Sequence, residues 1–72
     1  MKITINGEEK ILNHQPTSLE NLLTSLKYNP KLIVIEFNGK ILPSTSWKDQ
    51  TIKDEDSIEI VSIVGGGNYI IS

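Results

Sequence analysis

The residues best suited to chemistry in this sequence are three consecutive glycines near its carboxyl end, Gly65, Gly66 and Gly67. A segment without side chains is narrow, and its backbone can approach another molecule closely. Activation of a free glycine carboxylate by ATP would give an acyl adenylate, and attack by a sulfur donor would then leave a thiocarboxylate. Gly67 is therefore the candidate reactive group, on a flexible arm formed by Gly65 and Gly66. The alternative is a linker or turn without chemistry.

The sequence contains no cysteine, which excludes a disulfide, a thiolate nucleophile and a cysteine-based metal site. Sulfur could not be held as a persulfide either, so Gly67 is the only plausible place for it. His14 is the single histidine, and without a second ligand we expect a solvated loop residue rather than a metal site. No nucleophile, base and orienting group can be assembled, so we predict a carrier without catalytic residues or a bound cofactor, not an enzyme.

The charge pattern points to a protein partner. The chain has 72 residues, a net charge of −2 and seven scattered lysines. It therefore lacks the basic stripe of a nucleic-acid-binding protein. No apolar run approaches the roughly 20 residues of a membrane span, and no signal peptide is recognisable. We expect a cytoplasmic protein that contacts neither nucleic acid nor membrane.

The apolar pattern of the first 30 residues predicts a β-hairpin followed by a helix. Residues 1–5 alternate between apolar and polar, and Asn6-Gly7 is a preferred pair for a tight hairpin turn. Thr17 and Glu20 match a capping box. Asn29-Pro30 is expected to stop the helix. The apolar face of this helix has the spacing i, i+3, i+4, i+7 and consists of Leu19, Leu22, Leu23 and Leu26.

The second half predicts three more strands. Residues 32–37 form a nearly continuous apolar run, typical of a strand buried in the middle of a sheet. Asn38-Gly39 turns the chain into a short edge strand over residues 40–42. A polar loop over 44–51 and a charged turn precede the last strand, residues 58–64.

The order of these elements predicts an α+β fold of the β-grasp type, a mixed sheet with one helix across one face. Residues 1–64 would form the domain, and residues 65–72 the glycine arm with a five-residue extension. Val61 and Ile63 fall on the face opposite Ile58 and Ile60. They could form an apolar docking surface or pack under the 44–51 loop. Trp47 could anchor a partner or have a satellite packing role over the helix end or the sheet edge.

An ordered set of segments runs through the second half of the chain: Ile35-Glu36-Phe37-Asn38-Gly39-Lys40-Ile41-Leu42-Pro43, Trp47, Asp54-Glu55-Asp56-Ser57-Ile58-Glu59-Ile60-Val61 and Val64-Gly65-Gly66-Gly67. With this set the sequence resembles the ThiS family of sulfur carriers in thiamine biosynthesis. The resemblance covers the chain up to Gly67 and implies adenylation and thiocarboxylation at that residue, for the thiazole moiety of thiamine. It also implies three partners: a ubiquitin-activating-type (ThiF-like) adenylyltransferase that uses ATP and magnesium, a cysteine desulfurase, and a ThiG-like thiazole synthase.

The sequence departs from that family after the glycines. The carboxyl group of Gly67 is joined to Asn68 in a peptide bond, and an amide cannot be adenylated as a carboxylate can. We therefore expect a protease to remove residues 68–72. Three other functions remain open: a molybdopterin-synthase small-subunit-like carrier, a ubiquitin-like modifier, and a binding module in which residues 68–72 add a strand.

Overall fold

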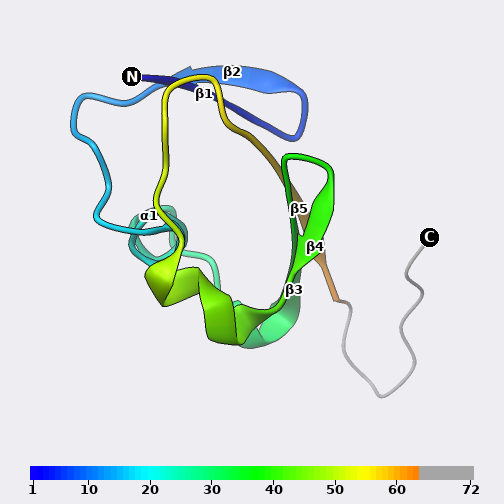
Figure 1. The fold of residues 1–72 in the computed structure, drawn as a ribbon. Helices are drawn as coiled ribbons and strands as arrows, with labels where there is room; N and C mark the ends of the chain where they lie inside the picture. The colour runs from blue at the N-terminus through cyan, green and yellow to red at the C-terminus, as the bar shows by residue number, and fades with distance from the viewer. Residues whose placement is uncertain (64–72) are drawn as a thin grey trace.

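The computed structural model describes residues 1–63, which form a five-stranded mixed sheet with one α-helix across one face (Figure 1). The strand order is β2-β1-β5-β3-β4. The first and last strands, β1 and β5, pair in parallel, and the other neighbours pair antiparallel. This confirms the predicted β-grasp arrangement. The elements are β1 (Lys2–Ile5), β2 (Glu8–Ile11), α1 (Leu19–Ser25), β3 (Ile33–Phe37), β4 (Lys40–Leu42) and β5 (Ser57–Ser62), with short 3₁₀ helices at Pro30–Leu32 and Ser44–Asp49.

The two Asn-Gly pairs make the tight turns expected of them. Asn6 and Gly7 have φ values of 52° and 81°, and Asn38 and Gly39 have values of 50° and 88°. Positive φ at both central positions is the conformation of a type I′ turn, whose twist matches that of the adjoining strands. These turns produce the β1–β2 and β3–β4 hairpins.

The helix begins one residue later than the capping box predicted. Ser18, not Thr17, is the N-cap, and its hydroxyl oxygen accepts a hydrogen bond of 3.0 Å from the backbone N–H of Asn21. That bond satisfies one of the free donors in the first turn. Residue 20 is therefore not in the position that would complete a capping box, and the Thr17–Glu20 prediction was wrong.

The helix also ends earlier than predicted. Its last residue is Ser25, and Leu26 is the C-cap. Lys27 then adopts a left-handed φ of 67°, and the N–H of Tyr28 donates to the carbonyl of Leu23 at 3.0 Å. This is a Schellman motif, which ends a helix by satisfying its free carbonyls. The Asn29-Pro30 pair therefore did not stop the helix, and proline instead begins a 3₁₀ helix.

The core lies between α1 and the face of the sheet that it covers (Figure 1). Three of the four predicted helix positions are buried, but Leu26 is 42% exposed because it follows the last helical turn. The described residues include no helix long and apolar enough to cross a membrane. The buried apolar residues are Ile3, Ile5, Leu19, Leu22, Leu23, Ile33, Ile35, Trp47, Ile52, Ile58 and Ile60.

Candidate functional site

The last strand leads directly toward the glycines. β5 lies between β1 and β3 (Figure 1), and its final residue, Ser62, is opposite Ile33. The N–H of Ile63 then donates to the carbonyl of Leu32 at 2.6 Å, so the chain is held in register up to the last described residue. The predicted arm, Gly65 and Gly66, and the candidate reactive residue Gly67 lie outside the described residues, and their role stays a prediction.

Beside the end of β5, the face of the sheet opposite α1 carries an apolar patch. Val61 lies opposite Val34 on β3, and the two side chains share this outer face. Val61 is 41% exposed and Val34 is half-buried, while Ile41 on β4 is 67% exposed. Ile63 continues the alternation of β5 and is half-buried. We call Val34, Ile41, Val61 and Ile63 the outer apolar patch.

The sequence left open whether Val61 is exposed on the sheet or packs under the 44–51 loop, and the outer apolar patch decides between the two. The Ser44–Asp49 segment packs on the same side of the sheet as α1 (Figure 1), through the buried side chain of Trp47. Val61 therefore has an exposed side chain on the opposite face and does not pack under that segment. Val34 and Ile41 were not singled out by sequence reasoning. Val34 lies opposite Val61, and Ile41 lies opposite Glu36 on the far side of β3, and both positions depend on how the strands pair.

The outer face also carries two glutamates opposite each other. Glu36 on β3 pairs with Glu59 on β5, and both are exposed. Among residues 1–63, neither carboxylate forms an ion pair. Because residues two apart point to the same side of a strand, this pair is one row away from Val34 and Val61. This glutamate pair was not predicted from the sequence. The one feature of the sequence that pointed to it was the acidic residue among apolar residues in each strand.

Trp47 is not available to a partner. It is 2% exposed, and its indole N–H donates to the carbonyl of Leu42 at 2.8 Å. The residue stands in the 3₁₀ helix Ser44–Asp49, where the sequence predicted a loop. A buried indole with a satisfied N–H has a structural role, so Trp47 belongs to the core and not to the outer apolar patch.

The acidic turn before β5 is also structural. The side chain of Asp56 accepts hydrogen bonds from the Asn38 side chain at 3.0 Å and from the backbone N–H of Lys53 at 2.7 Å. Asp54 accepts from the backbone N–H of Lys2 at 2.6 Å. These bonds fasten the turn to β1 and to the β3–β4 hairpin. The described residues contain no group of acidic, histidine or cysteine side chains that could hold a metal ion.

Lys2 links two strands and this turn on the same outer face. Its ammonium lies 3.5 Å from a carboxylate oxygen of Glu55 and 3.6 Å from one of Glu9. The charges of Glu55 and, to a lesser extent, Glu9 raise the pKa of Lys2 above its ordinary value, because both favour the protonated amine. Over β1 and β2 the outer face therefore contains paired charges.

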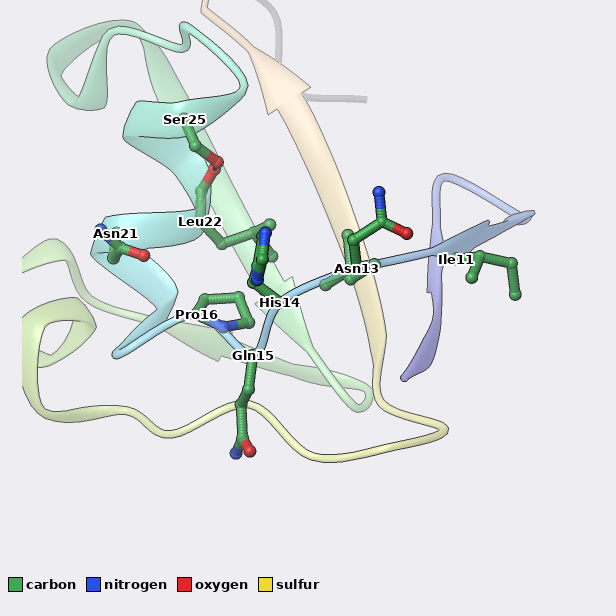
Figure 2. Close-up of a pocket in the computed structure, with 9 residues that line it drawn as sticks. Ile11, Asn13, His14, Gln15, Pro16, Asn21, Leu22 and Ser25 are labelled. Atoms are coloured by element: carbon green, nitrogen blue, oxygen red, sulfur yellow. Dashed lines mark hydrogen bonds between the residues drawn. The ribbon is translucent and has the colours of Figure 1, made fainter.

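His14 lines a shallow pocket between the β2–α1 connection and the helix, away from the end of β5 (Figures 1 and 2). Its polar neighbours take part in local hydrogen bonds: the hydroxyl of Ser25 donates to Leu22, and the amide oxygen of Asn21 accepts from Thr17. These bonds stabilise the helix ends. We therefore assign no chemistry to this pocket.

Comparison with known proteins identifies the group to which these features correspond. The model of the ThiS family matches residues 2–67, so its last matched residue is Gly67. The uncharacterized protein ycf40 of Porphyra purpurea is 42% identical over 67 residues, which cover 93% of each chain. The sulfur carrier protein ThiS of Bacillus subtilis is 29% identical over 65 residues, covering 90% of this chain and 98% of its own.

A larger relative contains a segment similar to the whole of this domain. The thiazole synthase of Paramagnetospirillum magneticum is 37% identical over 68 residues, covering 94% of this chain but only 21% of the relative. Among solved structures, the crystal structure of the thiamine biosynthesis protein (ThiS) from Geobacter metallireducens superposes with a TM-score of 0.80. Its sequence identity is 29%, and the match covers 93% of this chain and 100% of the other.

Proposed function

The chain belongs to the ThiS family of sulfur carriers, and we propose that it carries sulfur for the thiazole moiety of thiamine as a thiocarboxylate on Gly67. The observation that supports this most strongly is the extent of the family match, which runs from residue 2 to Gly67. β5 supports it as well, because a central strand paired on both sides fixes the position of the chain just before the glycines in the sequence.

The proposed chemistry occurs at one carboxylate. An oxygen of the Gly67 carboxylate attacks the α-phosphorus of ATP and releases pyrophosphate, giving an acyl adenylate. The terminal sulfur of a donor persulfide then attacks the acyl carbon and displaces AMP, which gives an acyl disulfide. A thiol attacks the donor sulfur of that disulfide and forms a new disulfide with the donor, and the thiocarboxylate is released as the leaving group. Glycine suits both steps because it has no side chain to obstruct the attacking group.

In this proposal the chain supplies the acyl group, while its partners supply the catalysis. A ThiF-like adenylyltransferase binds ATP and magnesium, a cysteine desulfurase provides sulfur, and a ThiG-like thiazole synthase receives it. Val61 and Ile63 of the outer apolar patch are the docking residues that we retain. They lie six and four residues before Gly67 in the sequence, so an enzyme that takes up Gly67 comes close to them.

The peptide bond between Gly67 and Asn68 has to be cleaved before this chemistry can begin. We propose that a protease removes residues 68–72. The intact mass of the protein isolated from its own host tests this directly. A species ending at Gly67, accompanied by one in which sulfur has replaced an oxygen, would support both proposals, and a single full-length species would contradict them.

Adenylation can be tested separately in vitro with the adenylyltransferase of the same organism. We expect ATP–pyrophosphate exchange with the form ending at Gly67 and none with the full chain, whose Gly67 has no free carboxylate. In the form ending at residue 67, Gly67→Ala should slow exchange without changing the melting temperature. Equal exchange with the full chain would show that Gly67 is not the acceptor.

A further inference from the structure

The pair Glu36–Glu59 places two like charges at a cross-strand position. Side chains directly opposite each other in an antiparallel pair have Cβ atoms about 5 Å apart, and like charges there destabilise the sheet. Both residues are exposed, and the described part of the chain provides no basic partner for them. Lys40 is the nearest lysine in this hairpin, but it lies opposite Phe37 and therefore belongs to the other face.

On the same outer face, the carboxylates over β1 and β2 have a basic partner. Over β1 and β2, Lys2 lies within 4 Å of carboxylate oxygens of both Glu9 and Glu55, at 3.6 and 3.5 Å. Over β3 and β5, the carboxylates of Glu36 and Glu59 lie beside the outer apolar patch, and neither forms an ion pair with a cation among residues 1–63. This part of the sheet is thus complementary to a surface that has an apolar centre and a basic side chain at its edge.

The same region precedes the proposed reactive residue by a short stretch of sequence. The row of Val34 and Val61 is about 7 Å along the strands from the glutamate row. Gly67 is the fourth residue after Ile63, so the two Cα atoms are at most about 14 Å apart. An enzyme that holds Gly67 in its active site is therefore within reach of this face.

We infer that the outer face of β3 and β5 docks thiazole synthase, and that the carboxylates of Glu36 and Glu59 receive an arginine or lysine side chain of that enzyme. This rests on the proposed function and specifies its acceptor step. Thiazole synthase is favoured because one such enzyme contains, in a single chain, a segment 37% identical to 94% of this domain. An arginine can bind both carboxylates, since its guanidinium presents several donors in one plane.

The test measures binding of thiazole synthase from the same organism to the form ending at Gly67, which keeps every residue of the described fold. The variant is Glu36→Gln with Glu59→Gln, which removes the two charges and preserves shape. The matched control is Glu20→Gln with Asp49→Asn, which removes two exposed charges from the helix and the 3₁₀ helix. Melting temperature and adenylation are measured on all three proteins.

We expect the Glu36/Glu59 variant to bind about tenfold more weakly at low salt, with a shallower dependence on salt. Its melting temperature should equal or exceed that of the parent, because a repulsion has been removed. The control should bind like the parent. Binding within twofold of the parent, or equal weakening in the control, would overturn the inference.

Adenylation distinguishes failure of this inference from failure of the proposed function. If the parent is adenylated and the Glu36/Glu59 variant still binds thiazole synthase normally, only the inference fails. If the variant loses adenylation but keeps thiazole synthase binding, the face serves the adenylating enzyme and the inference is again overturned. If the parent ending at Gly67 is not adenylated at all, the proposed function fails.

Discussion

The two faces of β3 and β5 are built from alternate residues of the same ten or so positions, yet they have opposite properties. On the inner face, Ile35 lies opposite Ile60 and both are buried under α1. On the outer face, the neighbouring pairs are Val34–Val61 and Glu36–Glu59, which are exposed or half-buried. The inner pairs bury apolar surface and therefore stabilise the fold. The outer pairs contribute little to stability, and one of them opposes it.

This difference teaches where to look for function in a domain of this size. A chain of 72 residues has a core close to the minimum for independent folding, so its inner positions have little freedom to serve anything else. The outer face has no such constraint. Val61, the half-buried Val34 and the two glutamates, which form no ion pair within residues 1–63, are consequently the residues that we connect with partners.

The largest loss of stability is expected from Ile35→Ala, which truncates a side chain on the inner face. Ile35 is fully buried between Ile60 and Leu42, and loss of such a side chain costs about 2–5 kcal/mol of unfolding free energy. Ile41→Ala on the adjacent strand is the control, since Ile41 is 67% exposed. Urea unfolding should show less than about 0.5 kcal/mol for the control. Similar losses in both variants would remove the distinction between the faces.

A smaller loss is expected on the covered side from Ser18→Ala. The Ser18 hydroxyl caps α1 at 3.0 Å and is the buried polar side chain of the described core. Its removal should cost about 1 kcal/mol by urea unfolding. Thr17→Ala should be nearly neutral, and a larger loss at Thr17 than at Ser18 would show that the helix begins at the residue predicted from the sequence.

Val61→Thr tests whether the outer face contributes to the stability of the fold. Threonine keeps the β-branched shape and replaces one methyl with a hydroxyl, so an exposed strand position should change by less than about 0.5 kcal/mol. Adenylation of the form ending at Gly67 should slow by about fivefold, because the hydroxyl loses hydration at an apolar interface. A stability loss without slower adenylation would assign Val61 to the fold.

The smallest effect concerns Lys2, whose contribution to stability should disappear at high pH. Glu55 and Glu9 raise the pKa of Lys2 in the folded state above the ordinary 10.5. Its contribution to stability is therefore fully present below that value and is lost as pH rises through the folded pKa. Urea midpoints of the parent and Lys2→Met, measured from neutral to strongly alkaline pH, should converge at the alkaline end. A constant difference would show that the ion pairs are not responsible.

The local features of this fold could be predicted from sequence because they depend on neighbouring residues. The Asn6-Gly7 and Asn38-Gly39 turns follow from the ease with which these residues adopt positive φ. The buried face of α1 follows from helical spacing. By contrast, the Schellman motif at Lys27 was not predicted, because lysine in a left-handed conformation carries no recognisable signal.

The candidate site was predictable only in part. The glycines could be identified from composition. Alternation placed Val61 on the face opposite Ile58 and Ile60 but left open whether its side chain is exposed or packs under the 44–51 loop. The other residues of the outer apolar patch on β3 and β4 could not. Val34 lies opposite Val61 through the pairing of β3 with β5, and Ile41 joins the same face through the pairing of β4 with β3. The run of residues 32–37 predicted a strand buried on both faces. Glu36 is exposed instead, because no second layer covers the outer face.

The central position of β5 has a consequence for the synthesis of the protein. Of the five strands within residues 1–63, β5 is the last to leave the ribosome, yet it lies between β1 and β3 and joins the two hairpins into one sheet. Until it is available, each hairpin lacks the neighbour that completes its buried face, and pairing of distant segments is slow compared with local folding. The domain should therefore fold only after translation of β5 and should be most exposed to aggregation and proteolysis just before that moment.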